Sequence, residues 1–303
     1  MRITQLRDLV AVADAGSIRG AARALDISQP ALTRSIRQLE AELHTQLLHR
    51  TGRGVVPTSS GKALLARART IHSELHQARE EQAQLAGERA GSVAFGVVPQ
   101  AAIHIVPPAL AQFRREHANA DVRIVDGLAH VLLPQLREGS LDFVIGSRPQ
   151  GGLESRFKAQ PLFTNQVVVG ARRGHPLRNA RSLRELVESQ WVIFTPPGWT
   201  GAMIPDTFVK NGLPPPRSVV RSDSYVAFLT LLAGTDMVAP LSRMLFEQRL
   251  ARNFFEPFRL KERLPEFSIG LFQRADSPLT PVAADMVAAV KAAARRLTFK
   301  AGK

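Results

Sequence analysis

The sequence contains no cysteine and no long hydrophobic run. The absence of cysteine excludes disulfides, thiolate zinc sites, iron–sulfur clusters and a cysteine nucleophile, and it fits a reducing compartment. The strongest hydrophobic stretches, such as residues 226–234, fall far short of the ~20 residues that a membrane span needs. The first five residues do not continue into a hydrophobic segment, so no signal peptide is visible. We therefore expect a soluble, cytoplasmic protein with no membrane partner.

The chain has 303 residues, of which 45% are hydrophobic, and a formal net charge of +14. This length suits two or three domains, and the composition predicts a packed core. Residues 1–73 hold 11 basic and 5 acidic side chains, and residues 91–303 hold 27 and 17. A basic excess favours polyanions as partners. For the C-terminal part, a generally arginine-rich proteome explains the excess equally well.

Hydrophobic residues recur at helical spacing from Leu6 onward, with Thr4 available as a cap and Gly16 as the end of the helix. Ser17 then precedes a short second helix over residues 18–25. A tight corner follows, and Ser28 is placed to cap a third helix.

The third helix has two distinct faces. Its hydrophobic residues lie at spacings of four, three and four, which predicts one buried face: Leu32, Ile36, Leu39 and Leu43. Its opposite face carries an amide, a hydroxyl and two guanidinium groups, which are the groups that read base edges in a major groove: Gln29, Thr33, Arg34 and Arg37. Two short helices meeting at a corner, the second with such a face, predict a helix-turn-helix.

Residues 47–58 read as a β-hairpin wing beside this helix. Gly52 and Gly54 permit the turn. Arg50 and Arg53 lie at that turn, where they are expected to reach phosphate or the adjacent minor groove.

Thr58 is expected to cap a long helix over residues 59–86. Hydrophobic positions alternate spacings of four and three, which is typical of a coiled-coil seam: Leu64, Ala68, Ile71, Leu75, Ala78, Gln82 and Leu85. A dimerising helix would place two heads on one duplex and therefore implies two half-sites. A helix packed on its own domain is the alternative.

From residue 92 short β-rich runs alternate with helical stretches, which predicts a parallel sheet covered by helices. A second block of this kind spans about 164–266. We therefore expect an α/β fold with three parts: a winged helix-turn-helix at 1–58, a linker helix at 59–90 and a two-lobed domain at 91–303. Lobe I comprises about 91–163 and 268–303, and lobe II about 164–267, with a ligand cleft between them.

The chain resembles the LysR-type transcriptional regulators over its full length. In the head the resemblance is carried by runs whose order and spacing match the family: Ala21-Ala22, Leu25, Ser28-Gln29-Pro30-Ala31-Leu32-Thr33, Ile36, Leu39-Glu40, Leu47-Leu48, Arg50, Arg53-Gly54-Val55 and Thr58-Ser59-Ser60-Gly61. A weaker set follows in the C-terminal part: Leu136, Gly139, Leu141-Asp142, Gly170, His175-Pro176-Leu177 and Gly234. The sequence departs from the family at Leu48, where phenylalanine is frequent, and at Pro57, where an aliphatic residue is usual.

The resemblance implies double-stranded DNA as a partner, contacted by Ser28, Gln29, Pro30, Thr33, Arg34, Arg37, Arg50 and Arg53. It also implies a periplasmic-binding-protein-like sensor, a tetramer built as a dimer of dimers, an interrupted dyad as operator, and RNA polymerase as a further partner. The residues matching the family's effector cleft come from five loops: Pro99, Gln100, Ala101 and Ile103; Gly127 and Leu128; Ser147 and Arg148; Thr195, Pro196, Trp199 and Gly201; Tyr225 and Val226.

Residues 99–102 offer no hydroxyl for an effector carboxylate, whereas the family often has one there. Backbone amides at a helix start can still hold an anion, with Arg148 or Gln100 assisting. Trp199 and Tyr225 then favour a small organic acid with an apolar or aromatic body. Both aromatics serving as core or interface residues is the alternative.

No feature of the sequence calls for an enzyme, a cofactor or a metal. His72 and His76 lie one helical turn apart but lack the H-E-x-x-H pattern, and a solvated helix face explains them. No serine has the G-x-S-x-G context, and a loop–strand hydrogen bond explains Asp142. A ligand-responsive transcription factor is therefore the leading interpretation. Its rivals are an architectural DNA-binding protein without an effector and an enzyme built on the two-lobed domain.

Overall fold

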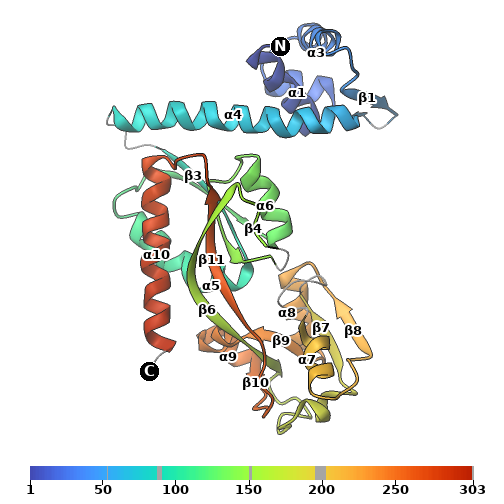
Figure 1. Cartoon of the computed structure of the whole chain (residues 1–303), viewed down its shortest axis with the longest axis vertical. Coiled ribbons are helices and arrows are strands. Elements are labelled where there is room, and N and C mark those ends of the chain that lie inside the picture. The colour runs from blue at the N-terminus through green and yellow to red at the C-terminus, as the bar shows by residue number, and fades with distance from the viewer. Residues whose placement is uncertain (53, 87–90, 150–151, 195–202, 302–303) are drawn as a thin grey trace.

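The computed structural model describes the chain except for residues 53, 87–90, 150–151, 195–202 and 302–303. A small N-terminal head sits on one long helix, α4 (Ser59–Leu85), and the α/β part lies on the opposite side of that helix (Figure 1). Among the described residues no helix is both long and apolar enough to cross a membrane.

The head consists of three helices and a hairpin. Helices α1 (Ile3–Ala15), α2 (Ile18–Ala24) and α3 (Gln29–Glu42) precede strands β1 (Leu48–Thr51) and β2 (Gly54–Pro57), which pair antiparallel. The predicted caps at Ser17, Ser28 and Thr58 all accept a backbone N–H three residues on. The expected cap at Thr4 is wrong, because α1 begins at Ile3 and Arg2 is its N-cap. Gly16 ends α1 in the left-handed conformation, at φ 62°, where glycine has no steric penalty.

The hydrophobic faces of the head helices meet in one core. Leu9, Leu32 and Leu39 are fully buried there, and Leu65 of α4 joins them. The linker helix therefore closes the head from below as well as extending from it.

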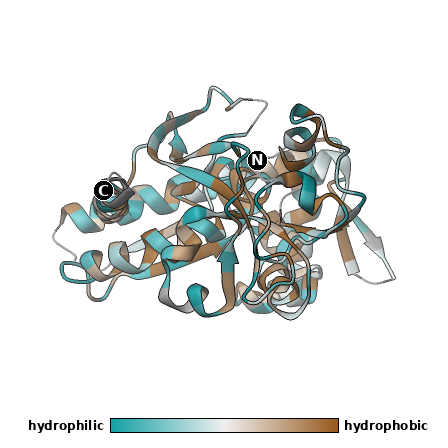
Figure 2. Cartoon of the chain, turned by 90° about the horizontal axis from the view of Figure 1, so that it is seen from below, coloured by the Kyte–Doolittle hydropathy of each residue, from teal (hydrophilic) through white to brown (hydrophobic). Residues whose placement is uncertain are grey.

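The larger sheet runs β10-β6-β11-β5-β3-β4. Strands β3 (Ser92–Val97), β4 (Asp121–Asp126) and β5 (Phe143–Ser147) are parallel to one another, as the alternation predicted. Helices α5 (Pro99–Phe113) and α10 (Pro281–Ala301) pack together over one face, and α6 (Ala129–Arg137) lies on the other (Figure 1). Hydrophobic residues concentrate where helices meet strands (Figure 2).

The expectation of parallel sheets throughout is wrong for the strands that join the lobes. Strands β6 (Phe157–Arg172) and β11 (Glu266–Arg274) pair antiparallel with each other, and both run from lobe I into lobe II. Strand β6 is a single strand of 16 residues, although only residues 167–169 form a run of β-branched side chains within it. Residues 158–161 are all exposed, so the first half of the strand shows no alternation of buried and exposed side chains.

Lobe II is built around the far end of β6. Strands β9 (Ala239–Ser242) and β10 (Phe255–Pro257) pair with it antiparallel, and β7 (Gln190–Ile193) pairs parallel with β8 (Ser218–Arg221). Helices α7 (Ile204–Lys210), α8 (Tyr225–Gly234) and α9 (Arg249–Phe254) cover these strands with the short helices η1 (Leu183–Leu186) and η3 (Arg243–Glu247). Trp191 is fully buried in this lobe and meets Phe208 edge-on.

Candidate DNA interface and effector cleft

The outer face of α3 is open to solvent. Its exposed and half-exposed side chains line a shallow groove: Gln29, Pro30, Thr33, Arg34, Arg37 and Gln38. Five of these residues were predicted from the sequence. Gln38 was not, although its position four residues after Arg34 places it on the same helical face. It accepts a hydrogen bond from Arg2 Nη2 at 2.8 Å.

Three contacts orient α3 within the head. The Ser35 hydroxyl donates to Asp8 Oδ2 at 2.6 Å, which ties α3 to α1. Glu40 Oε1 accepts the N–H groups of Leu47 and Leu48 at 2.8 and 3.2 Å, which ties it to the wing. The groove-facing side chains therefore stand on a helix that is anchored from both sides.

The wing lies where the sequence predicted it. Thr51 pairs with Gly54 across the turn, and Val55 N–H donates to Gly16 O at 2.8 Å. Gly54 is needed there because its φ is +135° and a Cβ would collide with the Gly16 carbonyl. The side chain of Arg50 and all of Arg53 lie outside the described residues.

A cavity lies between the lobes, where α5, α6 and α8 begin. It has a volume of about 60 Å³, well below the ~300–1,000 Å³ of drug-sized ligand sites. Its lining is mainly hydrophobic: Val98, Gln100, Leu128, Ala129, Ser147, Val167, Phe194, Tyr225, Phe228, Pro240, Leu241, Ser242, Phe267 and Ile269.

Four of the residues expected in the cleft line this cavity: Gln100, Leu128, Ser147 and Tyr225. The remaining described ones do not. Ala101 and Pro99 are buried beside it, and Ile103 packs in the lobe II core cluster. Gly127 does not line the cavity either, and a Cβ placed on it would point at the Leu132 side chain, 3.5 Å away.

Two further expected residues lie outside the cavity lining. Val226 is 75% exposed and Arg148 is exposed, and neither lines the cavity. Val226 faces away because it follows Tyr225 by one residue on a helix, where neighbours lie about 100° apart. Thr195, Pro196, Trp199 and Gly201 lie outside the described residues.

An aromatic cluster forms one wall of the cavity. Tyr225 stacks on Phe228 with ring centroids 5.7 Å apart and meets Phe194 edge-on at 4.9 Å. Burial, together with the nearby charge of Asp126, raises the pKa of the Tyr225 hydroxyl. The phenol therefore stays protonated and is available as a hydrogen-bond donor. Sequence reasoning missed both phenylalanines, although Phe228 follows Tyr225 by three residues on the same helix.

The polar groups of the cavity are few. Ser242 and Asn165 hydrogen-bond each other in the buried wall, at 2.7 and 3.1 Å. Helices α5 and α6 both begin without a side-chain cap. Pro99 has no N–H, and the N–H groups of Ala101 and Val131 donate to the carbonyls of Val98 and Leu128. The backbone N–H groups of the lining residues Gln100 and Ala129 are the first-turn donors that face a ligand. No arginine, lysine or histidine occurs among the described lining residues.

One contact joins the lobes beside the cavity. His104 of α5 is buried and lies 3.0 Å from Gln248 Nε2, through its Nδ1 atom. Burial lowers the pKa of His104, and the carboxylate of Glu247 partly offsets that effect.

Comparison with known proteins matches both parts of this architecture. Residues 3–62 match the bacterial regulatory helix-turn-helix model of the LysR family, and residues 86–295 match the LysR substrate binding domain. The regulator GbpR of Azospirillum brasilense is 31% identical over 296 residues, which cover 97% of this chain and 86% of that protein.

Full-length solved structures share the fold. CbnR in complex with its target DNA superposes with a TM-score of 0.69 at 20% identity, covering 97% of this chain and 100% of that one. LysG of Corynebacterium glutamicum, solved with bound arginine as effector, gives 0.65 at 18% identity, covering 98% and 99%. The chain therefore belongs to the LysR family of DNA-binding transcriptional regulators with an effector-binding domain, and not to a family of enzymes.

Proposed function

We propose that this regulator senses a small organic acid with an aromatic or apolar body in the cavity between its lobes, and that the acid alters its binding to a dyad operator. The observation that carries the proposal is the composition of the cavity wall. An aromatic cluster lies opposite the uncapped starts of α5 and α6. A helix start attracts anions through its free N–H groups and its dipole, and the rings suit an apolar body.

The absence of a cationic lining side chain among the described residues limits the charge that the cavity accepts. Two helix starts and the Tyr225 hydroxyl offer neutral donors, so a single carboxylate is the anion that they suit best. The small volume favours one ring or a short chain over a larger effector.

A matched ligand series tests the effector class. Benzoate, benzamide and benzylamine share one ring and differ in charge. We expect benzoate to raise the melting temperature of the full chain, because a ligand that binds only the folded state stabilises it. Stabilisation by benzamide or benzylamine alone would refute the acid assignment. Footprints on an operator selected from random duplexes, with and without benzoate, then separate a sensor from an architectural protein.

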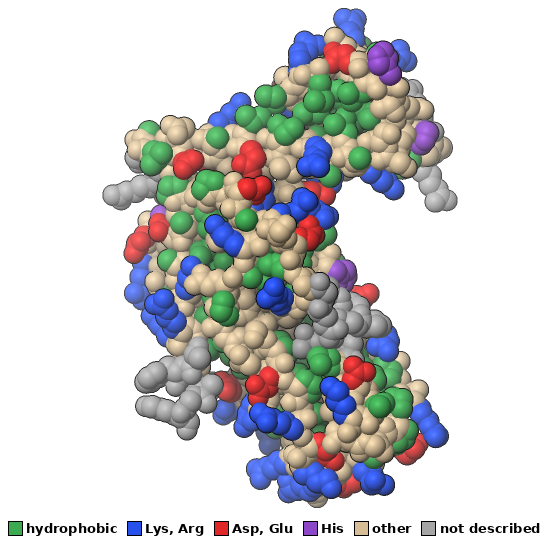
Figure 3. All heavy atoms as spheres, in the orientation of Figure 1, with side chains coloured by type: hydrophobic (Ala, Val, Ile, Leu, Met, Phe, Trp, Pro, Cys, Tyr) green, Lys and Arg blue, Asp and Glu red, His purple; other side chains and the backbone are tan. Residues whose placement is uncertain are grey.

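The same proposal includes the oligomer. On α4 the residues Ile71 and Leu85 are 38% and 68% exposed, and Ala78 is exposed as well. Leu64 and Leu75 are half-buried, whereas Ala68 is fully buried within its own chain. Hydrophobic side chains also gather over the head and along α4 on one face of the molecule (Figure 3). We infer that this seam pairs two chains and that pairs associate further into a tetramer.

Light scattering of Ile71→Asp and Leu85→Asp tests the seam. A charge placed on a paired hydrophobic seam should yield smaller assemblies than the parent protein. Arg79→Asp is the control, because Arg79 is exposed on the same helix outside the seam. Unchanged mass in both seam variants would contradict the coiled coil. We also propose the domain boundaries given above. The DNA-binding head ends near residue 58, the linker helix ends near residue 90, and the two lobes divide near residues 163 and 268.

A further inference from the structure

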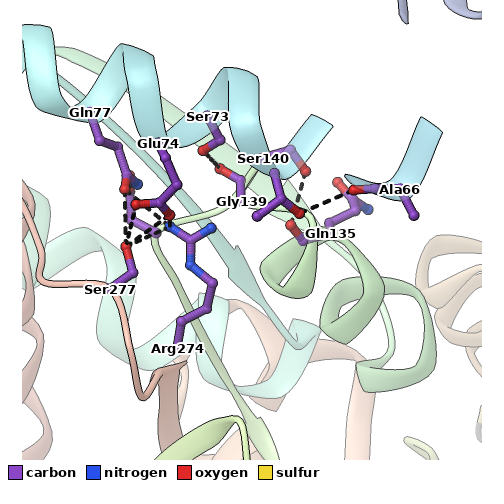
Figure 4. A network of polar contacts seen from close by, with 11 residues as sticks. Ala66, Ser73, Glu74, Gln77, Gln135, Gly139, Ser140, Arg274 and Ser277 are labelled. Atoms are coloured by element: carbon purple, nitrogen blue, oxygen red, sulfur yellow. Dashed lines mark hydrogen bonds and ion pairs between the residues drawn. The ribbon is translucent and has the colours of Figure 1, made fainter. Parts of the chain in front are cut away.

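The polar face of α4 is bound to lobe I by one buried arginine. Arg274, the last residue of β11, is 7% exposed. Its Nη2 atom pairs with Glu74 Oε1 at 2.9 Å and also donates to Gln77 Oε1 and Ser277 Oγ, both at 3.0 Å (Figure 4). Two of these three partners, Glu74 and Gln77, lie on α4, so the guanidinium holds strand and helix together.

A glycine allows the helix to come this close. Ser73 of α4 donates its hydroxyl to Gly139 O at 2.6 Å. Gly139 has φ +79°, and a Cβ there would overlap both Ser73 Oγ and Arg274 Nη1. A side chain at 139 would therefore displace Ser73 or Arg274, and the positive φ would add backbone strain. We call Ser73, Glu74, Gln77, Gly139, Arg274 and Ser277 the linker contact.

Gln77 connects a second strand to the linker contact. Its Nε2 donates to Asp142 Oδ1 at 2.9 Å, while Asp142 Oδ2 accepts Ala94 N–H at 2.8 Å. Asp142 directly precedes β5. One amide of α4 thus binds the start of β5 and, through Arg274, the end of β11.

The other ends of these two strands form the effector cavity. Ser147 ends β5, and its register partner in β11 is Ile269. Both line the cavity. At ~3.3 Å per residue, the five residues of β5 separate the cavity from the linker contact by roughly 17 Å of hydrogen-bonded strand pair. The β5–β11 ladder is continuous from the Ser147–Ile269 pair at the cavity to the Phe143–Gln273 pair beside the linker contact.

An arginine extends the connection to the head. Arg69 of α4 pairs with Asp14 of α1 at 2.5 Å and with Glu138 at 3.3 Å. These ion pairs are partly exposed, and exposed pairs contribute little to stability. The buried linker contact must therefore supply most of the fixation.

We propose that Arg274 and Gly139 are positioning residues that fix lobe I on the linker helix, and that the β5–β11 pair carries displacement from the cavity to α4 and the head. This inference goes beyond the proposed effector class and stands whichever ligand fills the cavity.

The cysteine-free sequence permits a direct test. Cysteines introduced at the exposed residues Lys62 and Ser155 take nitroxide labels on either side of the contact. The labelled full chain is mixed with excess unlabelled chain, so that electron–electron resonance reports distances within one subunit. We expect one narrow distance distribution in the parent protein and a broad, longer one in Arg274→Ala.

Two further variants guard against loss of folding. Glu74→Ala removes a partner that is 46% exposed in its side chain, and Gly139→Ala adds only a methyl group. Both should broaden the distribution, while Arg274→Lys should restore part of its sharpness. Arg172→Ala, which breaks an exposed ion pair with Asp236 in lobe II, is the control and should leave it unchanged.

A narrow distribution retained in Glu74→Ala and Gly139→Ala, with unchanged helix content, would overturn the positioning role. Ser147→Phe tests transmission, because the larger side chain fills the cavity end of β5. Ser147→Phe should shift the mean distance between the two labels in the otherwise unmutated protein. It should leave that distance unchanged when Gly139→Ala is also present. An unshifted mean in the parent background would overturn transmission. No effector is used, so failure of the acid proposal leaves this test intact.

Discussion

The candidate DNA-binding surface on α3 and the candidate effector cavity between the lobes are built in opposite ways. One helical segment, residues 29–38, supplies the whole groove of α3. The cavity takes its lining from residues scattered between 98 and 269. The residues of a site on one helix face recur at helical spacing, so the pattern can be recognised in the sequence. An assembled site depends on how distant segments pack, and single residues within it carry no local signal.

The largest expected effect tests whether the head depends on its own core. Leu39 is fully buried on the inner face of α3. Leu39→Ala should lower the unfolding free energy of the head by about 2–5 kcal/mol through lost packing and a cavity, measured by chemical denaturation. Leu43→Ala is the matched control. The sequence places Leu43 on the buried face, but in the structure it is the C-cap of α3 and is 37% exposed, so its loss should cost much less. If both variants lost the same unfolding free energy, the inner face of α3 would not form the core of the head.

Replacing a groove residue should affect recognition and spare stability. Arg34 is exposed on α3. Arg34→Ala should weaken binding to a selected operator by about 1–3 kcal/mol and relax base preference, because guanidinium groups read base edges. Arg259→Ala, an exposed arginine of the effector domain, should leave operator affinity nearly unchanged in the same titration. Intact site discrimination in Arg34→Ala would contradict the assignment of this face.

The expected loss of ligand affinity at the cavity is smaller, because several groups contact the ligand and each contributes only part of the binding free energy. Tyr225→Phe keeps the stacked ring and removes only the hydroxyl. Affinity for benzoate should fall by about 0.5–1.5 kcal/mol, the net value of a hydrogen bond, as measured by calorimetry. Val226→Ala, one residue along and 75% exposed, should bind benzoate like the parent protein. A stronger effect at Val226 than at Tyr225 would place the ligand elsewhere.

The smallest effect concerns pH. Burial lowers the pKa of His104 below its ordinary value of 6.5. As the pH falls through that value, the unfolded chain takes up a proton before the folded chain does, so the unfolding free energy decreases on acidification. His104→Gln should reduce this acid sensitivity in melting curves recorded as a function of pH. The exposed His49 provides the control substitution, His49→Gln. Identical pH profiles for parent and His104→Gln would contradict the role of this histidine.

The features that the sequence predicts correctly are local ones. The caps at Ser17, Ser28 and Thr58 and the hairpin at Gly54 depend on interactions over three or four residues, which the sequence displays directly. The first half of β6 has no strand-like pattern in the sequence, because residues 158–161 are all exposed and do not alternate with buried ones. Of the cleft residues carried over from the family, Gln100, Leu128, Ser147 and Tyr225 line the cavity, whereas Val226 and Arg148 do not.

The sequence alone determined the head, the linker helix and the alternation of strands and helices, because each rests on periodicity, capping and turn chemistry between near neighbours. Only the tertiary structure decided that β6 and β11 cross both lobes, that Phe194 and Phe228 flank the cavity with Tyr225, and that Arg274 meets Glu74 across 200 positions of chain. Such contacts arise when faces of distant helices and strands pack together, and this packing leaves no repeating pattern in the sequence.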